Sequence, residues 1–168
     1  MLLEVLKYPH PILKQKAEPI AEITPEILQL AESMLETMYE NEGIGLAAPQ
    51  VGELKRLVVI DLTGPEVREA PMILVNPELE LLGEDIESEE GCLSVEDYRN
   101  IVKRKERVRL KARSLTGTSI EMDADELFAV CLQHECDHLD GTLFIDHLSR
   151  LKRTLYDSKV KKRLKANS

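Results

Sequence analysis

The first periodic pattern in the chain is helical. Thr24 followed by Pro25 is a favoured helix start, because the threonine hydroxyl accepts a hydrogen bond from a free N–H and proline suits the first turn. The apolar residues that follow keep to one helix face until Gly43: Ile27, Ala31, Met34 and Met38. The pattern predicts a helix over residues 25 to 42.

Shorter apolar runs and period-two alternation follow. They predict strands over residues 56 to 61, 72 to 75, 79 to 86 with a break at Gly83, and 107 to 113. In the last of these, arginine and lysine alternate with apolar residues. An RNA-binding ribbon is one interpretation, but a half-buried strand with a charged solvent face is favoured.

A second helix is predicted near residue 126, where Asp123 and Glu126 have the spacing of a capping box. Along it, five residues fall within about 80° of arc, namely Leu127, Val130, Cys131, His134 and His138. Such a stripe usually packs into a core, but here it is apolar at its start and carries histidines at its end. The alternative is an apolar pocket beside a metal site. Because helices and strands do not alternate regularly, we expect an α+β fold with antiparallel sheets around this central helix, N-terminal helices and a C-terminal helix.

The charge distribution is uneven. The chain has 168 residues and is 43% hydrophobic, so we expect one catalytic domain over residues 1 to 148 and a basic helical tail, residues 149 to 168, that belongs to it. The tail has a net charge of +7 and the remainder −16, which makes −9 in total. The acidic body argues against DNA binding. The tail is either a solvated helix whose Leu148, Leu151 and Leu155 pack inward or a docking element for an anionic partner.

The expected location is the cytoplasm. The start, MLLEVLKYPHP, has no basic n-region, and no apolar run reaches the roughly 18 residues of a membrane helix. Three cysteines, an odd number, suggest a reducing compartment.

The stretch His134-Glu135-Cys136-Asp137-His138 is the chain's strongest chemical signal. Residues four apart lie on one helix face, so the two imidazoles can bind one metal ion. Glu135 flanks the pair without ligating, which suits a base that takes a proton from metal-bound water.

The third ligand must come from elsewhere. Phe144 stands where metzincins have a third histidine, and no glutamate follows residue 141. His147 is an alternative, although a predicted apolar strand over residues 143 to 145 would carry it away. Cys136 faces the opposite side of the helix, and Cys131 lies two turns before His138, too far along the axis. Cys92, beside a glycine in a separate segment, is favoured.

Three stretches resemble, in order and spacing, the signature motifs of bacterial peptide deformylase: GIGLAAPQVG (43–52), EGCLS (90–94) and QHECDHLDG (133–141). The resemblance extends to about residue 165. The chain has Glu96 where many relatives have proline, a departure that affects a surface turn.

The resemblance implies removal of the N-formyl group from the N-terminal methionine of new polypeptides, with release of formate. Glu135 would be the general acid and base, and Cys92, His134 and His138 would hold one Fe²⁺, for which Zn²⁺, Ni²⁺ or Co²⁺ can substitute. Gln50, through its amide, and Leu93, through its backbone N–H, would bind the developing oxyanion.

The resemblance also implies how the peptide binds. The methionine side chain would lie between Ile44 and a wall formed by Leu127, Val130 and Cys131. The backbones of Ile44, Gly45 and Gly91 would pair with the extended peptide. The basic C-terminal helix would sit on the ribosome near the tunnel exit. The role of Arg99 stays open between orienting substrate and pairing with a carboxylate.

Two other functions are weighed against this one. A zincin-type endopeptidase would share the histidine helix but needs room for peptide on both sides of the metal. A structural metal module would have a closed fourth coordination position and no task for Gln50 or Glu135.

Overall fold

The computed structural model describes residues 1 to 167, so Ser168, the last residue of the predicted tail, lies outside the described residues. Its helices are α1 (Pro25–Glu40), α2 (Gly64–Val67), α3 (Glu126–Leu139) and α4 (Arg150–Ala166), with short 3-10 helices η1 (Pro11–Lys14), η2 (Ala48–Val51) and η3 (Phe144–His147). Its strands are β1 (Gly45–Ala47), β2 (Leu57–Ile60), β3 (Met72–Cys92), β4 (Val95–Arg113) and β5 (Ser119–Asp125).

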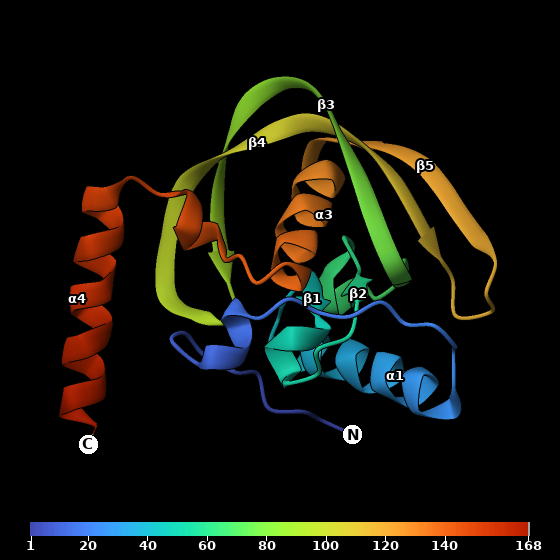
Figure 1. Ribbon diagram of the computed structural model, residues 1–168, viewed down its shortest axis with the longest axis horizontal. Helices are drawn as coiled ribbons and strands as arrows, with labels where there is room; N and C mark the ends of the chain where they lie inside the picture. The colour runs from blue at the N-terminus through green and yellow to red at the C-terminus, as the bar shows by residue number, and fades with distance from the viewer. Residues whose placement is uncertain (168) are drawn as a thin grey trace.

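Among residues 1 to 167, five strands form one antiparallel sheet in the order β1-β2-β3-β4-β5. The long strands β3 and β4 arch over α3, which stands at the centre of the molecule with α1 beneath it and α4 to one side (Figure 1).

The predicted α+β class and central helix are confirmed. The predicted strands 72 to 75 and 79 to 86 are one strand, whose pairing with β4 shifts register at Val75/Glu78 and at Leu82/Asp85. Gly83, with φ +81°, lies at the second shift.

The basic strand β4 lies between two acidic strands. Arg109 is opposite Glu80 on β3 and Asp123 on β5, and Lys111 is similarly flanked by acidic residues. Opposite charges facing each other across a sheet stabilise the pairing of strands. The charges of Arg109 and Lys111 therefore have partners within the sheet, which supports a solvent-facing strand over an RNA-binding ribbon.

The inner face of β4 packs against α3. Side chains alternate between the two faces of a strand, and the even-numbered residues Val108, Leu110 and Ala112 are buried with Leu132 and Leu139 of α3. This packing holds α3 in place inside the sheet.

The central helix begins near residue 126 as predicted, but the predicted capping box of Asp123 and Glu126 is wrong. Asp123 lies within β5, where its carboxylate accepts a hydrogen bond from Arg109 Nε at 3.0 Å. The helix begins at Glu126, and the side chain of its N-cap residue, Asp125, makes no capping hydrogen bond. Pairing with β4 competes with capping for these residues and keeps them extended.

Two C-terminal predictions are also wrong. Residues 143 to 145 do not form a strand, because a 3-10 helix begins at Phe144. On α4, Leu151 and Leu155 are 69% and 59% exposed, whereas Tyr156 is 2% exposed. The ring of Tyr156 packs on that of Tyr98, with centroids 4.4 Å apart, so the aromatic residue sets the buried face of the helix.

Candidate metal centre

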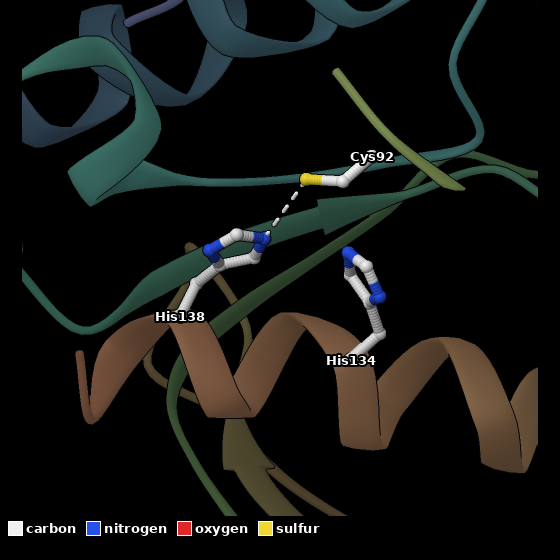
Figure 2. A group of neighbouring side chains, drawn as sticks. All are labelled: Cys92, His134 and His138. Atoms are coloured by element: carbon white, nitrogen blue, oxygen red, sulfur yellow. Dashed lines mark hydrogen bonds between the residues drawn. The ribbon is translucent and has the colours of Figure 1, made fainter. Parts of the chain in front are cut away.

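Three metal-binding side chains converge from two elements. His134 and His138 rise from one face of α3 toward Cys92, the last residue of β3 (Figure 2). Their ligand atoms all lie within 4.8 Å of one another, and Cys92 Sγ is 3.4 Å from His138 Nε2. Tetrahedral coordination at usual bond lengths separates ligand atoms by about 3.3–3.8 Å. The distance between Cys92 Sγ and His138 Nε2 lies in this range, and the three ligand atoms are close enough for one zinc-like or ferrous ion to draw them together.

Burial and neighbouring charges shift the pKa values of the two imidazoles in opposite directions. Burial, together with the charges of His134 and Arg104, lowers the pKa of His138 well below its usual value, so its ring is neutral and able to ligate. Burial also disfavours charge on His134, but Cys92 and Glu90 outweigh it and raise its pKa. Binding of a cation here displaces a proton from His134.

Glu90 and Arg104 orient the first histidine. Glu90 Oε1 accepts a hydrogen bond from His134 Nδ1 at 3.0 Å, which leaves Nε2 for a metal. Arg104 donates to both oxygens of Glu90, from Nε at 2.9 Å and Nη2 at 2.7 Å. Burial would raise the pKa of Glu90, but the hydrogen bonds from Arg104 and His134 lower it to about 2.

Neither Glu90 nor Arg104 is among the site residues predicted from the sequence. A signal was present for Arg104, because it shares strand parity with Val102 and Val108 and therefore points inward. Glu90 opens the EGCLS motif and shares strand parity with Cys92, but its pairing with Arg104 joins residues 14 apart across the hairpin, which no local pattern indicates.

Gln50 lies at the metal centre with a fixed amide orientation. It is 1% exposed, and its Oε1 accepts a hydrogen bond from the Ala47 backbone N–H at 3.0 Å. Its Nε2 donates to Ser94 Oγ at 3.1 Å and approaches Cys92 Sγ at 3.5 Å. The N–H₂ end of the amide therefore faces the metal ligands.

A cavity of about 600 Å³ opens beside the trio. Cys92, His134 and Glu135 lie against it. The other predicted site residues that line it are Ile44, Gly45, Gln50, Gly91, Leu93, Leu127, Val130 and Cys131, and Arg99 lines it as well. The stripe on α3 thus faces a cavity, and Leu127 remains 54% exposed. A cavity touching two of the three ligands leaves room for a further ligand, unlike a closed structural site.

Glu135 borders this cavity as a buried carboxylate. Burial raises its pKa to about 7, and within residues 1 to 167 its Oε1 has no hydrogen-bond partner. Gly45 of β1 packs against it so closely that a Cβ at position 45 would be 2.6 Å from Glu135 Oε2. Only glycine at position 45 lets β1 lie this near to the carboxylate.

The remaining candidate ligands lie outside the trio. Cys131 lines the cavity, whereas Cys136 borders a second cavity of about 520 Å³. His147 does not move away from α3 as expected: η3 turns it back, and its Nε2 donates to Asp137 Oδ2 at 2.8 Å. It is therefore bound to the histidine helix without joining the metal ligands.

Over the described part of the chain, no helix combines the length and the apolar content needed to span a bilayer.

Comparison with known proteins agrees with this geometry. The family model described as polypeptide deformylase matches residues 2–154. A peptide deformylase of Phenylobacterium zucineum is 50% identical over 164 residues, 97% of each chain. The crystal structure of a peptide deformylase from Legionella pneumophila superposes with a TM-score of 0.91 at 39% identity, covering 100% of this chain and 99% of that one.

A second structure, that of the Ehrlichia chaffeensis peptide deformylase in complex with actinonin, has a TM-score of 0.89 at 34% identity and covers 96% of this chain and 97% of that one. The chain therefore belongs to the polypeptide deformylase family and is a metal-dependent hydrolase that removes the N-formyl group from newly made peptides.

Proposed function

We propose that Cys92, His134 and His138 hold the metal ion of this deformylase and that Glu135 is its general base and acid. The observation that carries the proposal is the trio, whose ligand atoms lie within 4.8 Å of one another, next to a buried carboxylate with one oxygen that has no hydrogen-bond partner among residues 1 to 167. A divalent ion bound there supplies a Lewis acid that activates water and polarises the formyl carbonyl.

Glu135 moves the proton in both halves of the reaction. Its unpaired oxygen accepts a proton from the attacking water as the water oxygen bonds to the formyl carbon. The protonated carboxyl then gives that proton to the departing nitrogen as the carbon–nitrogen bond breaks, which yields formate and a free amino terminus. A pKa near 7 suits a group that both accepts and donates at neutral pH.

Gln50 and Leu93 bind the formyl oxygen as it becomes negative. The Gln50 amide is held by Ala47 and Ser94, so its N–H₂ group needs no reorientation during the reaction. Lys7 Nζ donates to the Leu93 carbonyl at 2.6 Å and steadies the backbone of this residue. The Leu93 N–H is the second proposed donor.

The cavity accepts the methionine side chain, and the edge of the sheet accepts the peptide backbone. Leu127, Val130 and Cys131 offer an apolar wall, with Ile44 on another. Strand β1 is the end strand of the sheet, and the Ile44 carbonyl already accepts a hydrogen bond from Asp61 N at 2.8 Å. Because backbone groups alternate in direction along an edge, those of Gly45 face a bound peptide. Gly91 pairs with the peptide from the opposite side.

Iron is the proposed native metal. A thiolate with two imidazoles suits Fe²⁺ and Zn²⁺ alike, and Ni²⁺ or Co²⁺ should also support turnover. The proposed ratio is one ion per chain.

The basic helix α4 is the proposed contact to the ribosome near the tunnel exit. Its exposed lysines support a surface for an anionic partner. The burial of Tyr156 and Val160 supports α4 as part of the same domain as residues 1 to 148. Because the substrates emerge from ribosomes, the proposed location is the cytoplasm.

Formate release from formyl-Met-Ala-Ser under anaerobic conditions tests the function. We expect turnover that a chelator abolishes and Fe²⁺ restores. Cleavage of an unformylated peptide without formate release would favour an endopeptidase instead. Cys92→Ala should abolish stoichiometric metal binding, whereas Cys131→Ala and Cys136→Ala should each keep one ion per chain. Full metal binding by Cys92→Ala would refute the proposed ligand set.

A further inference from the structure

A line of five ionisable side chains runs from the metal centre to the protein surface. From His134 it passes to Glu90 at 3.0 Å, to Arg104 at 2.7 and 2.9 Å, to Asp137 at 2.7 Å and to His147 at 2.8 Å. These residues come from α3, β3, β4, α3 again and η3. The side chain of Arg104 is 3% exposed and that of His147 38%, so the line begins in the interior and ends in solvent.

Arg104 couples the positions of its two carboxylate partners, Glu90 and Asp137, because its guanidinium is planar and rigid. Nε and Nη2 donate to Glu90, while Nη1 donates to Asp137. A shift of the Nη1 end therefore rotates the pair of bonds to Glu90. Since Glu90 is the partner of His134 Nδ1, that rotation also turns the ligating imidazole.

His147 holds the outer end. Asp137 Oδ2 accepts from both Arg104 Nη1 and His147 Nε2, so the imidazole fixes the oxygen against which Arg104 rests. The position of His147 is itself secured in η3, where the preceding residue, Asp146, accepts a hydrogen bond from Leu143 N at 2.8 Å. Arg104, Asp137 and His147 also border the second cavity.

We propose that His147, acting through Asp137, Arg104 and Glu90, is a positioning residue that holds His134 in its metal-binding orientation. The proposal rests on the proposed metal ligands. It assigns His147 neither ligation nor contact with substrate.

Release of Co²⁺ from the loaded protein into excess chelator tests the proposal. Loss of a group that orients a metal ligand typically costs about 10- to 100-fold in metal affinity or activity. We expect His147→Leu and Asp137→Asn to release Co²⁺ about 10-fold faster or more, with a lower kcat and little change in KM. His147→Gln, which keeps an N–H donor at similar reach, should restore slow release.

Lys105→Met is the matched control, because Lys105 neighbours Arg104 on β4 but pairs with Asp85 at 2.8 Å, outside the line. It should release Co²⁺ at the original rate. Original release rates in His147→Leu and Asp137→Asn, or a His147→Gln protein as impaired as His147→Leu, would overturn the proposal. Stoichiometric Co²⁺ binding and formate release by the unchanged protein test the proposed function separately. Failure of the proposed function can therefore be distinguished from failure of the positioning role of His147.

Discussion

Glu135 combines burial with an unpaired oxygen, as a proton-transfer group requires. Glu135→Gln keeps the shape of the side chain but cannot accept the proton. We expect one metal ion per chain and a rate of formate release lower by about 10²- to 10⁴-fold. Metal analysis beside the kinetic assay checks both parts. Undiminished turnover would remove Glu135 from the mechanism.

Gln50→Leu should lower kcat by about 10²- to 10³-fold, because it removes a donor to the developing oxyanion. Ser94→Ala is the control: it deletes the partner of Gln50 Nε2 but leaves the amide present, so its loss should be much smaller. The measurement is steady-state formate release over a range of substrate concentrations. An effect of Gln50→Leu on KM alone would contradict the role.

Asp61 ties the end of β2 to α1 through a hydrogen bond from Tyr39. Burial alone would raise the pKa of Asp61, but hydrogen bonds from Thr63 and Tyr39 outweigh it and lower the pKa. A carboxylate with a lowered folded-state pKa stabilises the protein above its unfolded pKa of about 4, and this stability is lost as pH falls further.

Asp61→Asn should therefore lower Tm by about 5 °C at pH 7. The gap between the two proteins should narrow as pH falls below about 4 and the native carboxylate takes up a proton. Calorimetry across this range measures it. A gap that stays constant with pH would show that the charge of Asp61 does not contribute.

At the scale of elements, local patterns predicted the three long helices, α1, α3 and α4, but not how every face is oriented. Leu148, Leu151 and Leu155 form a plausible apolar stripe on the C-terminal helix, yet only Leu148 packs against the core. The rings of Tyr8 and Tyr98 lie beside Tyr156 in the folded protein. These partners are remote in sequence, so no local period indicates them.

Two adjacent substitutions on α4 test this face. Tyr156→Ala should lower the free energy of unfolding by about 3 kcal/mol or more, because a buried aromatic ring is lost. Leu155→Ala, one residue away and exposed, should change it by about 0.5 kcal/mol or less. Urea denaturation of both variants measures the difference. Equal effects would contradict the described orientation of α4.

At the scale of the whole molecule, the charges separate into an acidic body and a basic helix at one side (Figure 1). Within the body, Arg109 and Lys111 of β4 have acidic residues opposite them on both neighbouring strands. The exposed lysines of α4 therefore offer the clearest surface for an anionic partner.

Replacing Lys159, Lys161 and Lys162 by glutamate should reduce cosedimentation with ribosomes while leaving the helix in place. The effect should weaken with added salt, because exposed charges are screened. The same replacement by glutamate at three lysines outside α4, namely Lys14, Lys16 and Lys55, is the control and should have little effect on cosedimentation. Equal cosedimentation of all three proteins would end the ribosome hypothesis.

The sequence by itself determined the histidine pair, its flanking glutamate and the helix that carries them, because one helical turn brings residues four apart to the same face. The sequence also favoured Cys92 over the other candidates for the third metal ligand. Tertiary structure decided the features that depend on contacts between residues distant in the chain. These are the start of α3 directly after β5, the inward orientation of Arg104, its hydrogen bonds to Glu90 and the return of His147 to α3. The reason is physical, since periodicity encodes local backbone geometry, whereas the partner of a buried charge depends on strand register and packing.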